Sequence, residues 1–456
     1  MGRKAAFHNL GCKVNEYETE AMIQELERAG YETVPFAPGA DVYVINTCTV
    51  TNIADRKSRQ MLHRAKEMNP SAAVVAVGCY VEDARSRLQA DPAVDIIVGN
   101  NDKSNLAAIL DAWYTERAGK DPAEETVPYT DNINYVRSYE ELEIDRTAGR
   151  TRAYIKIQDG CNQFCSYCMI PYVRGRVRSR KAEDVLTEAE RLSRAGYREI
   201  VITGIHISSY GLDFDAPDEN RQTPDASEAR TNERLLDLIR RICALDGVRR
   251  VRLGSLEPGV MTEPFVRSIA SLPEICPQFH LSLQSGCDAT LARMKRKYNT
   301  AEFRDRVGLL RRWFHEPAIT TDIITGFPGE TDEEFAKTVE FVKELHFAKT
   351  HVFKYSRRDG TRAAAMPEQL TDAVKHRRSL VLIDLDRQNR RAYAEQFRGR
   401  TVEALFEERK EDGEGCYMTG HTREALEVRF RTEEDVGGEI REMIVRDVLP
   451  DGTLLV

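Results

Sequence analysis

The sequence predicts an α/β protein built from three consecutive parts: a parallel sheet, a partial barrel of six strand–helix units, and a small β-barrel. Residues 1–120 alternate short apolar strands with amphipathic helices, and residues 147–392 repeat that alternation six times. Beyond residue 400, short strands and glycine-bearing turns replace the helices. Strands alternating with helices imply a parallel sheet covered on both faces, whereas short strands joined by turns imply an all-β domain. At roughly 100–200 residues per domain, a chain of this length holds two to four domains.

The first part contains four expected strands, at residues 5–10, 41–45, 73–77 and 96–99. Helical patterns follow the first three of them, and the first helix, at 17–29, ends at Gly30. Residues 121–146 are acidic and contain proline, which indicates a linker between the first part and the second.

The second part contains six expected strands, at residues 153–157, 199–203, 250–253, 279–283, 321–325 and 349–353. Helices are expected between them at 182–195, 233–245, 261–271, 300–314 and 333–345. Six units are two fewer than a closed eight-unit barrel requires, so we expect a partial barrel with an open side.

The third part, residues 393–456, begins near the end of a basic helix at 372–396. Its expected strands cover 401–406, 425–430, 439–447 and 453–456, with glycine turns at Gly413, Gly415, Gly420 and Gly437. A small β-barrel of this kind is typical of domains that bind RNA.

Composition and charge exclude several classes of protein. The chain has 66 Lys and Arg against 74 Asp and Glu, a net charge of −8, and 41% of its residues are apolar. It contains neither an apolar run long enough to cross a membrane nor a secretion signal at its start, so we expect a cytoplasmic protein without membrane contact. Much of the acidity lies in residues 121–145 and 213–233. The negative total therefore leaves room for a local basic face that binds nucleic acid.

Three cysteines of the first part share one structural position. Cys12, Cys48 and Cys79 each come after an expected strand and before a helix. Because the carboxyl ends of parallel strands meet at one edge of a sheet, the three thiols should converge there. Helix N-termini favour anionic sulfur, so this edge suits a metal cluster. The alternative is three unrelated small residues at tight turns.

Cys161, Cys165 and Cys168 form a Cys-x3-Cys-x2-Cys motif directly after the first strand of the second part. Three thiolates ligate three irons of a 4Fe-4S cluster and leave the fourth iron open, as a reactive cluster requires. A zinc ribbon would need a second Cys or His pair at short range, and none follows.

This motif, at the first strand of a six-unit barrel, resembles the radical S-adenosylmethionine (SAM) superfamily. The resemblance implies that the open iron binds SAM and that an electron from the cluster cleaves it to a 5′-deoxyadenosyl radical. It also implies SAM contacts near strand ends, from Tyr167, Thr203, Gly204, Ser255, Glu257, Gln284, Gly326 and Phe327.

Further motifs narrow the resemblance to the methylthiotransferases, which carry an N-terminal cluster domain and a C-terminal RNA-binding TRAM barrel. These motifs are Leu10-Gly-Cys-Lys-Val-Asn15, Asn46-Thr-Cys-Thr-Val50, Gly78-Cys79, Asp159-Gly-Cys-Asn162 and Ile170-Pro-Tyr-Val-Arg-Gly175. Within that family the N-terminal motifs are most similar to the threonylcarbamoyladenosine tRNA branch. The resemblance implies an enzyme that methylthiolates carbon 2 of N6-threonylcarbamoyladenosine at position 37, next to the anticodon.

The chemistry of that reaction agrees with two clusters. Carbon 2 carries an unactivated C–H bond, which side-chain acids and bases cannot easily replace, so a cofactor radical is needed. We assign Cys12, Cys48 and Cys79 to a second, auxiliary 4Fe-4S cluster that carries the sulfur. The implied reaction uses two SAM molecules, an external electron donor and a sulfur-supplying system.

A basic run leaves the cluster loop and is our predicted tRNA contact: Arg174, Arg176, Arg178, Arg180 and Lys181. Phosphate contacts of this kind give affinity and register without base choice. The anticodon loop is single-stranded, which suits entry of an unstacked adenine into the cavity.

The sequence leaves three alternative functions open. One is the same chemistry on isopentenyladenosine in tRNA or on an aspartate of a ribosomal protein. Another is a different radical SAM enzyme in which the N-terminal cysteines are structural. The third is a non-enzymatic iron–sulfur protein that carries electrons or binds RNA.

Overall fold

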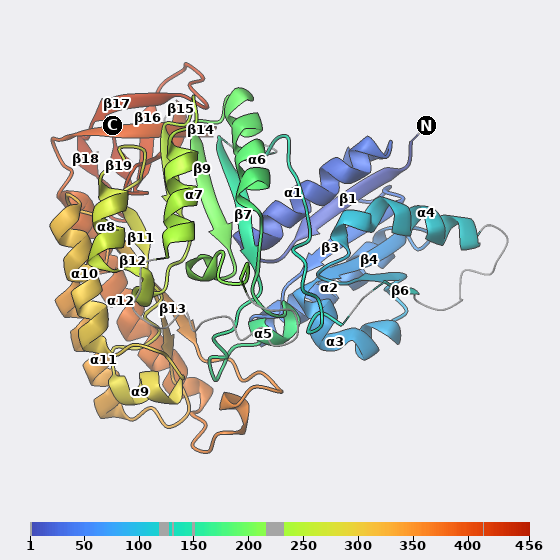
Figure 1. The fold of residues 1–456 in the computed structure, drawn as a ribbon, viewed down its shortest axis with the longest axis horizontal. Coiled ribbons are helices and arrows are strands. Elements are labelled where there is room, and N and C mark those ends of the chain that lie inside the picture. Colours follow the sequence, from blue (N-terminus) through green and yellow to red (C-terminus); the bar gives the residue numbers. More distant parts are fainter. Residues whose placement is uncertain (1, 118–126, 130–131, 148–150, 216–231, 414) are drawn as a thin grey trace.

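The computed structural model describes residues 2–117, 127–129, 132–147, 151–215, 232–413 and 415–456. An N-terminal parallel sheet, a partial barrel and a C-terminal sheet lie in that order along the chain, and the barrel contacts both of the others (Figure 1). The predicted fold class is therefore confirmed. Among the described residues, no helix is both long and apolar enough to cross a lipid bilayer.

The N-terminal sheet is wholly parallel, in the order β2-β1-β3-β4-β5-β6. Its strands are β1 (Lys4–Asn9), β2 (Glu32–Val34), β3 (Val42–Thr47), β4 (Ala73–Gly78), β5 (Ile96–Val98) and β6 (Val127–Tyr129). Its helices are α1 (Lys13–Arg28), α2 (Asn52–Met68), α3 (Cys79–Gln89), the short η1 (Lys103–Asn105) and α4 (Leu106–Arg117).

Both faces of this sheet are covered, as apolar strands require. Val42 and Val44 pack with α1 and α4 in one core cluster. Tyr43 and Ile45, which point the opposite way, pack with α2 and α3 in another.

The segment expected as a linker is partly structured. Residues 127–129 form β6, which pairs with β5 in parallel, with Ile96 opposite Val127. Farther along, Leu142 and Ile144 are buried in the core of the barrel. The expectation of an acidic linker over 121–146 was therefore wrong for these residues, because apolar side chains spaced among the acids find partners on both neighbouring domains.

The barrel consists of two three-stranded parallel ladders, β7-β9-β10 and β11-β12-β13, with the short β8 antiparallel to β7. Backbone bridges from Val251 to Ile275 and from Leu256 to Leu281 join the ladders. The strands are β7 (Arg152–Asp159), β8 (Arg178–Ser179), β9 (Glu199–Gly204), β10 (Arg250–Leu253), β11 (Gln278–His280), β12 (Ala318–Thr325) and β13 (Lys349–Lys354).

Helices cover the outside of the barrel. The longer ones are α6 (Ala182–Arg194), α7 (Glu233–Cys243), α8 (Glu263–Ala270), α10 (Thr300–Trp313) and α11 (Asp332–Leu345). Shorter helices lie in the connecting segments: α5 (Ile170–Val173), α9 (Asp288–Arg293), η2 (Ile207–Ser209), η3 (Pro258–Val260) and η4 (Ala363–Ala365).

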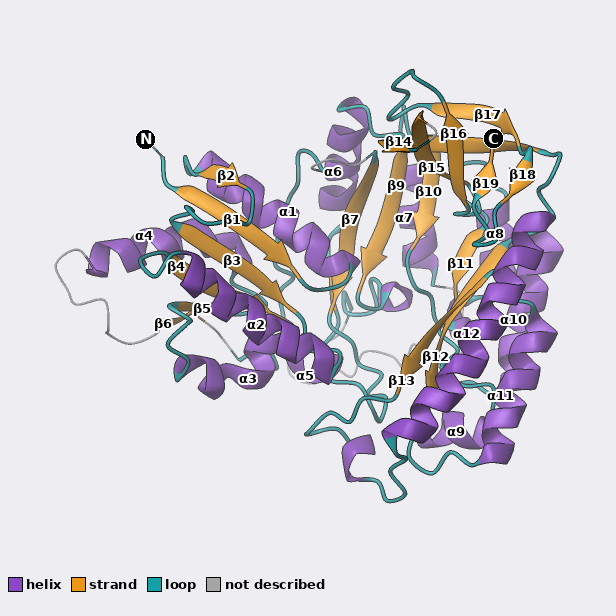
Figure 2. Ribbon diagram, turned by 180° about the vertical axis from the view of Figure 1, so that it is seen from behind, coloured by secondary structure: helices purple, strands orange, loops and turns teal. Residues whose placement is uncertain are grey.

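The N-terminal domain contacts the barrel at both margins of its open side. Near β7, Glu18 of α1 pairs with Lys156 at 2.7 Å. Beyond β13, Arg358 pairs with Asp55 of α2 at 2.5 Å and with Asp83 of α3 at 2.8 Å. The arrowheads of β1 and β3 and those of β7 and β9 approach a common region near α5 (Figure 2). The carboxyl edges of the two sheets, where ligands bind in parallel sheets, therefore meet.

The long helix α12 (Asp372–Glu395) leads from the barrel to the C-terminal sheet. This sheet has the order β17-β14-β15-β16-β19-β18 and is antiparallel except between β16 and β19. Its strands are β14 (Thr401–Asp412), β15 (Gly415–Thr422), β16 (Glu427–Arg431), β17 (Ile440–Ile444), β18 (Asp447–Val448) and β19 (Leu454–Leu455).

Strand β15 was not among the expected strands, because Gly415 and Gly420 were interpreted as turn residues. Gly420 instead lies inside the strand, opposite Phe406 beside a β-bulge. A Cβ atom there would lie 2.2 Å from the carbonyl oxygen of Leu405. This glycine permits a close approach of two backbones and does not mark a turn.

Candidate functional site: two cysteine trios joined by one segment

The three N-terminal cysteines meet at the carboxyl edge of their sheet. Cys12 immediately precedes α1, Cys48 follows β3, and Cys79 is the first residue of α3. Burial raises the pKa of Cys48 to about 11, and the Cys79 and Cys12 thiols contribute to the rise. The three sulfurs are therefore electrostatic neighbours. We call these residues the N-terminal trio.

The backbone around the N-terminal trio is tightly constrained. Gly78 has a φ of +98°, and a Cβ atom there would lie 2.5 Å from Oδ1 of Asn46 and 2.6 Å from the carbonyl oxygen of Thr47. The Asn15 amide donates to Asn46 Oδ1 at 2.9 Å and to the Thr47 carbonyl at 3.1 Å. Only glycine fits before Cys79, and buried amides hold the strand end beside Cys48.

Arg174 reaches the N-terminal trio from the barrel. Its Nε donates to Sγ of Cys79 at 3.1 Å, and its Nη1 pairs with Glu18 at 2.6 Å and with Asp159 at 3.2 Å. The side chain is fully buried. Burial by itself raises the pKa of Glu18, but the charges of Arg174, Lys103 and Lys156 outweigh it and lower that pKa to about 2. The cluster therefore stays ionised and joins the two domains.

This burial contradicts part of the predicted RNA contact. Arg178 is also buried and donates to the Arg174 carbonyl at 2.9 Å, and buried Arg180 pairs with Glu188. A buried guanidinium cannot reach a phosphate backbone, so the assignment of Arg174, Arg178 and Arg180 to tRNA binding was wrong for this structure. The three arginines instead neutralise buried carboxylates or cap buried carbonyls.

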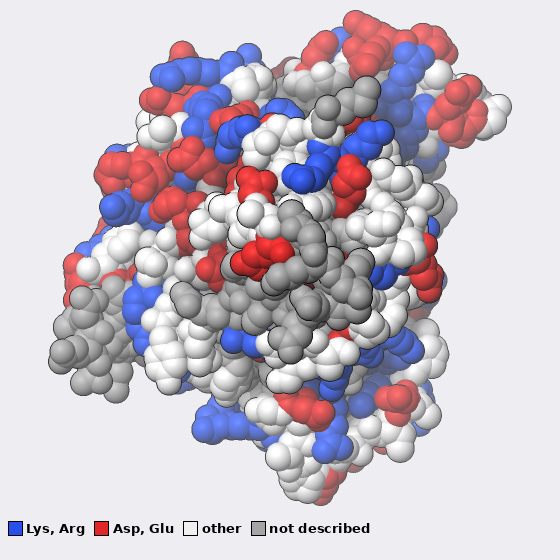
Figure 3. All heavy atoms as spheres, turned by 90° about the vertical axis from the view of Figure 1, so that its right-hand side faces the viewer, with Lys and Arg blue, Asp and Glu red and all other residues white. Residues whose placement is uncertain are grey.

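The other two residues of that run are more accessible. Arg176 is half-buried over the ring of Phe164, 4.5 Å from its centroid, and Lys181 is exposed. Their RNA contact stays a prediction. Basic and acidic side chains are interspersed on the face that Figure 3 shows, without a single large basic patch.

The second set of cysteines lies in the loop after β7, and we call Cys161, Cys165 and Cys168 the barrel trio. Burial raises the pKa of Cys168 to about 12, and the Cys165 thiol adds to the rise. Burial raises the pKa of Cys161 far above its usual value, with contributions from the other two thiols. These three sulfurs therefore also lie together.

Gly160 shapes the loop of the barrel trio. It has a φ of +70°, and a Cβ atom there would lie only 1.9 Å from the carbonyl oxygen of Arg176. The next residue, Cys161, donates its backbone N–H to the Gly175 carbonyl at 3.1 Å. The loop is thus packed against the segment that carries Arg174.

Two consecutive residues connect the trios. Arg174 donates to a sulfur of the N-terminal trio, while the carbonyl of Gly175 accepts from the backbone of the barrel trio. The two sets of thiols, which lie far apart in the sequence, therefore border one region of space.

Arg296 has the same relation to the barrel trio that Arg174 has to the N-terminal trio. Its Nη1 donates to Sγ of Cys165 at 3.2 Å, and its Nη2 pairs with Glu257 at 2.7 Å. The sequence analysis did not single out Arg296. Its position two residues before Tyr298, whose hydroxyl it contacts at 2.8 Å, gave no sign of this role.

Several residues expected to contact SAM lie around the barrel trio. Tyr167 and Phe327 are edge-to-face, with ring centroids 6.3 Å apart, and Phe327 also packs on Tyr355. Gly326 has a φ of +71°, and a Cβ atom there would lie 2.4 Å from the side chain of Lys375. Glu257 reaches the trio through Arg296.

Thr203, Gly204 and Ser255 line a cavity of about 550 Å³ whose wall also includes Cys12. Gln284 lies outside this lining and has a φ of +72°, a strained conformation for a non-glycine residue. Its backbone pairs with β12 instead. The structure thus brings Thr203, Gly204 and Ser255 toward the N-terminal trio and groups Tyr167, Glu257 and Phe327 near the barrel trio.

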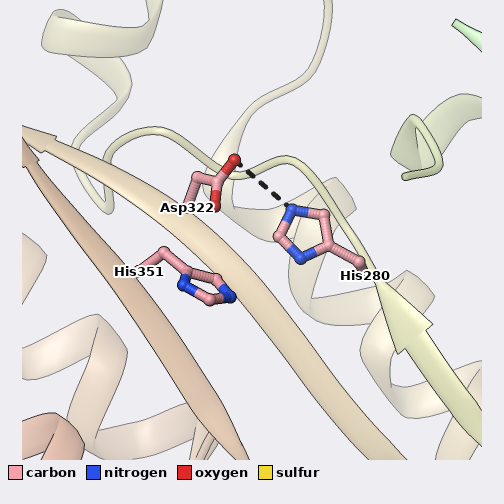
Figure 4. A group of neighbouring side chains, drawn as sticks. All are labelled: His280, Asp322 and His351. Carbon is pink, nitrogen blue, oxygen red and sulfur yellow. Dashed lines mark ion pairs between the residues drawn. The ribbon is translucent and has the colours of Figure 1, made fainter. Parts of the chain in front are cut away.

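The same cavity contains a group that the sequence did not indicate. His280, Asp322 and His351 come from β11, β12 and β13 and each offers a ligand atom within 4.8 Å of the others. The carboxylate of Asp322 faces the ring of His280, at 3.4 Å from Nε2 (Figure 4).

The donor sets fit iron–sulfur clusters. Each trio supplies three thiols near enough for their charges to raise one another's pKa, and a 4Fe-4S cluster held by three cysteines keeps one iron open. Each trio also has a buried arginine that donates to one sulfur, as outer partners of metal ligands commonly do.

Family models match two regions of the chain. Residues 4–99 match a model described as uncharacterized protein family UPF0004, and residues 155–342 match the radical SAM superfamily. These ranges contain the N-terminal trio and the barrel trio respectively.

Full-length relatives extend the match. A threonylcarbamoyladenosine tRNA methylthiotransferase of Bacillus subtilis is 42% identical over 436 residues, covering 95% of this chain and 92% of the relative. A tRNA-2-methylthio-N6-dimethylallyladenosine synthase of Rhodococcus jostii is 33% identical and covers 94% of this chain and 83% of the relative.

Among solved structures, a radical SAM methyltransferase from Kitasatospora setae has a similar fold. Its TM-score is 0.56 at 18% identity, over 80% of this chain and 77% of the other. With two cysteine trios in place and near-full-length relatives above 30% identity, the chain belongs to the radical SAM methylthiotransferase family.

Proposed function

We propose that this protein methylthiolates carbon 2 of N6-threonylcarbamoyladenosine in the anticodon loop of tRNA. The relatives with this activity in their names include the Bacillus subtilis protein and one of Aquifex aeolicus that is 35% identical over 407 residues. The nearness of the two cysteine trios, joined by Arg174 and Gly175, carries the proposal. A reaction that both activates a C–H bond and inserts sulfur needs its two cofactors beside one substrate pocket.

When bound, two 4Fe-4S clusters and SAM supply a radical for the C–H bond and a sulfur and methyl group for the product. The six cysteines would hold the clusters as thiolates. Arg174 and Arg296 each donate a charged hydrogen bond to one sulfur and thereby fix its orientation. Both are themselves held by carboxylates, so neither has to reorganise when a cluster binds.

The residues near the barrel trio would contact different parts of SAM. Tyr167 and Phe327 offer an aromatic wall for the adenine. Glu257, whose pKa stays below its usual value because Arg296 and His206 outweigh its burial, keeps a negative charge that suits an ammonium group. Thr203, Gly204 and Ser255 line the adjoining cavity with Cys12 and would form the side of the SAM site that faces the N-terminal trio.

The RNA reaches the cavity from the side of the C-terminal sheet. The C-terminal domain contributes His421 of β15 and the loop residues Glu424 and Thr453 to the cavity wall, so a bound anticodon loop would touch both domains. Arg176 and Lys181 remain candidate contacts at the other margin. We expect external donors to supply the electron and the replacement sulfur, and we expect the reaction to occur in the cytoplasm.

The decisive experiment compares Cys48→Ser, Cys165→Ser and the wild type after anaerobic reconstitution. We expect about eight irons per chain in the wild type and about four in each variant. Cys165→Ser should neither cleave SAM nor form product. Cys48→Ser should still cleave SAM to 5′-deoxyadenosine but yield no methylthiolated nucleoside by mass spectrometry.

Cys416→Ser is the matched control, because Cys416 lies in β15, outside both trios. It should retain eight irons and full product. Methylthiolated nucleoside from Cys48→Ser would overturn the role of the N-terminal trio. Product on isopentenyladenosine RNA, with none on threonylcarbamoyladenosine RNA, would overturn the proposed substrate.

A further inference from the structure

The cavity beside Cys12 contains two cations that are not neutralised by a partner. Lys13 follows Cys12 directly, and Lys349 begins β13 on the other side of the open barrel. Within the part of the chain that the structure describes, neither ammonium makes a hydrogen bond or an ion pair. Cations that line a cavity without a partner suit an anionic ligand.

The other cations of the cavity wall are already engaged. Arg152 pairs with Glu407 at 2.7 Å, and Arg252 pairs with Glu199 at 2.8 Å. Arg390 donates to a backbone carbonyl at 3.1 Å. Within the described residues, Lys13 and Lys349 are therefore the Lys and Arg side chains of the wall without a hydrogen-bonding partner.

The group of His280, Asp322 and His351 lines the same cavity as Lys13 and Lys349. Burial lowers the pKa of His351, the Asp322 carboxylate raises it, and the charges of Lys349, His280 and Lys13 lower it further, so both lysines lie within electrostatic reach of this group. Asp322 is the one acid of the group, and it faces His280 (Figure 4). Two nearby ammonium groups make this a poor site for a divalent cation. The side chains of His280, Asp322 and His351 are instead available to pair with the hydrogen-bond donors of an organic anion.

We infer that Lys13 and Lys349 bind the carboxylate of the substrate's threonylcarbamoyl group, with Asp322 and His351 beside them for its hydroxyl and N–H groups. This inference rests on the proposed function. It assigns substrate choice to the cavity wall and not to the cysteine trios, which would serve any adenine substrate equally well.

The chemistry of the nucleoside supports this placement. Carbon 2 and the N6 substituent lie on different sides of the ring atom N1. An adenine that presents carbon 2 to the clusters therefore projects its substituent away from them, along the wall. An isopentenyl group there would leave both ammonium groups desolvated and unpaired, so the same lysines select against it.

The test uses the reconstituted enzyme and two anticodon stem-loop RNAs. One carries threonylcarbamoyladenosine and the other its methyl ester, in which the carboxylate loses its negative charge and gains one methyl group. We expect the wild type to favour the acid over the ester by about tenfold or more in kcat/KM for the methylthiolated nucleoside, as charged hydrogen bonds allow. Lys349→Met should bring this ratio close to one, and Lys349→Arg should restore most of it.

Lys13→Met is the second variant. Because Lys13 is next to Cys12, this variant is informative only if it still holds about eight irons per chain. Lys337→Met, on the exposed side of α11, is the matched control and should keep the wild-type ratio. Equal wild-type rates on acid and ester would overturn the inference, as would an unchanged ratio in both Lys349→Met and Lys13→Met. A wild type inactive on either RNA would instead overturn the proposed function.

Discussion

The two cysteine trios present similar thiols, but the chain assembles them in opposite ways. The barrel trio comes from one loop of eight residues, Cys161–Cys168, so its spacing is visible in the sequence. The N-terminal trio comes from three strand ends that are 36 and 31 residues apart, and only the parallel sheet unites them. A loop motif survives most changes elsewhere in the fold, whereas a site assembled by a sheet depends on every strand that builds it.

The strongest test of this comparison changes the glycine that directly precedes one cysteine of each trio, Gly160 before Cys161 and Gly78 before Cys79. Gly160→Ala would collide with a backbone carbonyl, and Gly78→Ala with a strand end that cannot move away, in addition to the strain of their positive φ. We expect each variant to lose one cluster, about four irons, and all methylthiolated product. Gly160→Ala should also lose SAM cleavage, and Gly78→Ala should retain it.

Gly308→Ala is the control for these variants. Gly308 lies in α10 with no atom near its missing Cβ, so alanine there should leave the iron content unchanged and stabilise the helix slightly. If Gly78→Ala kept both clusters, the N-terminal trio would not depend on the sheet edge as described.

A second test removes the arginine that joins the trios. Arg174→Met leaves Glu18 and Asp159 with fewer buried partners, which should lower the free energy of unfolding by about 3–5 kcal/mol. Urea denaturation of the iron-free chain measures this. The exposed pair of Arg194 and Glu190 provides the comparison, because Arg194→Met should cost at most about 1 kcal/mol. A similarly small loss of unfolding free energy for Arg174→Met would show that other contacts hold the N-terminal domain against the barrel.

The smallest expected effect concerns Arg296. Arg296→Met removes a charged donor to Sγ of Cys165 and should lower the reduction potential of the barrel-trio cluster. A shift on the order of 60 mV corresponds to a tenfold change for one electron. A redox titration followed by electron paramagnetic resonance would detect it. The potential of the other cluster should stay constant, and a shift in both would mean that Arg296 acts through the fold and not through its sulfur contact.

The sequence alone was sufficient for much of the architecture. The alternation of strands and helices predicted the parallel sheet and the six-strand barrel, because a strand buried on both faces has to be apolar along its length. The Cys-x3-Cys-x2-Cys motif was equally direct, since neighbouring ligands need no long-range packing to be recognised.

Charges were less predictable. Arg174, Arg178 and Arg180 had the spacing of a phosphate-binding run, yet they are buried beside Glu18, Asp159 and Glu188. A basic residue has the same local pattern whether it meets RNA or a carboxylate, and its partner here lies 8 to 156 residues away. Strand β15 was missed for a related reason, since Gly420 serves a close contact with Leu405 that no local pattern records.

What the sequence determined by itself was the class of chemistry: ligand types, their local spacing and the periodicity of the elements that carry them. The tertiary structure alone decided that the two trios border one region, that Arg174 and Arg296 each serve a sulfur, and that Lys13 and Lys349 face one cavity. The physical reason is that electrostatic and packing energies depend on distance in space. The number of residues between two positions limits their distance in space only when the positions are close together in the sequence.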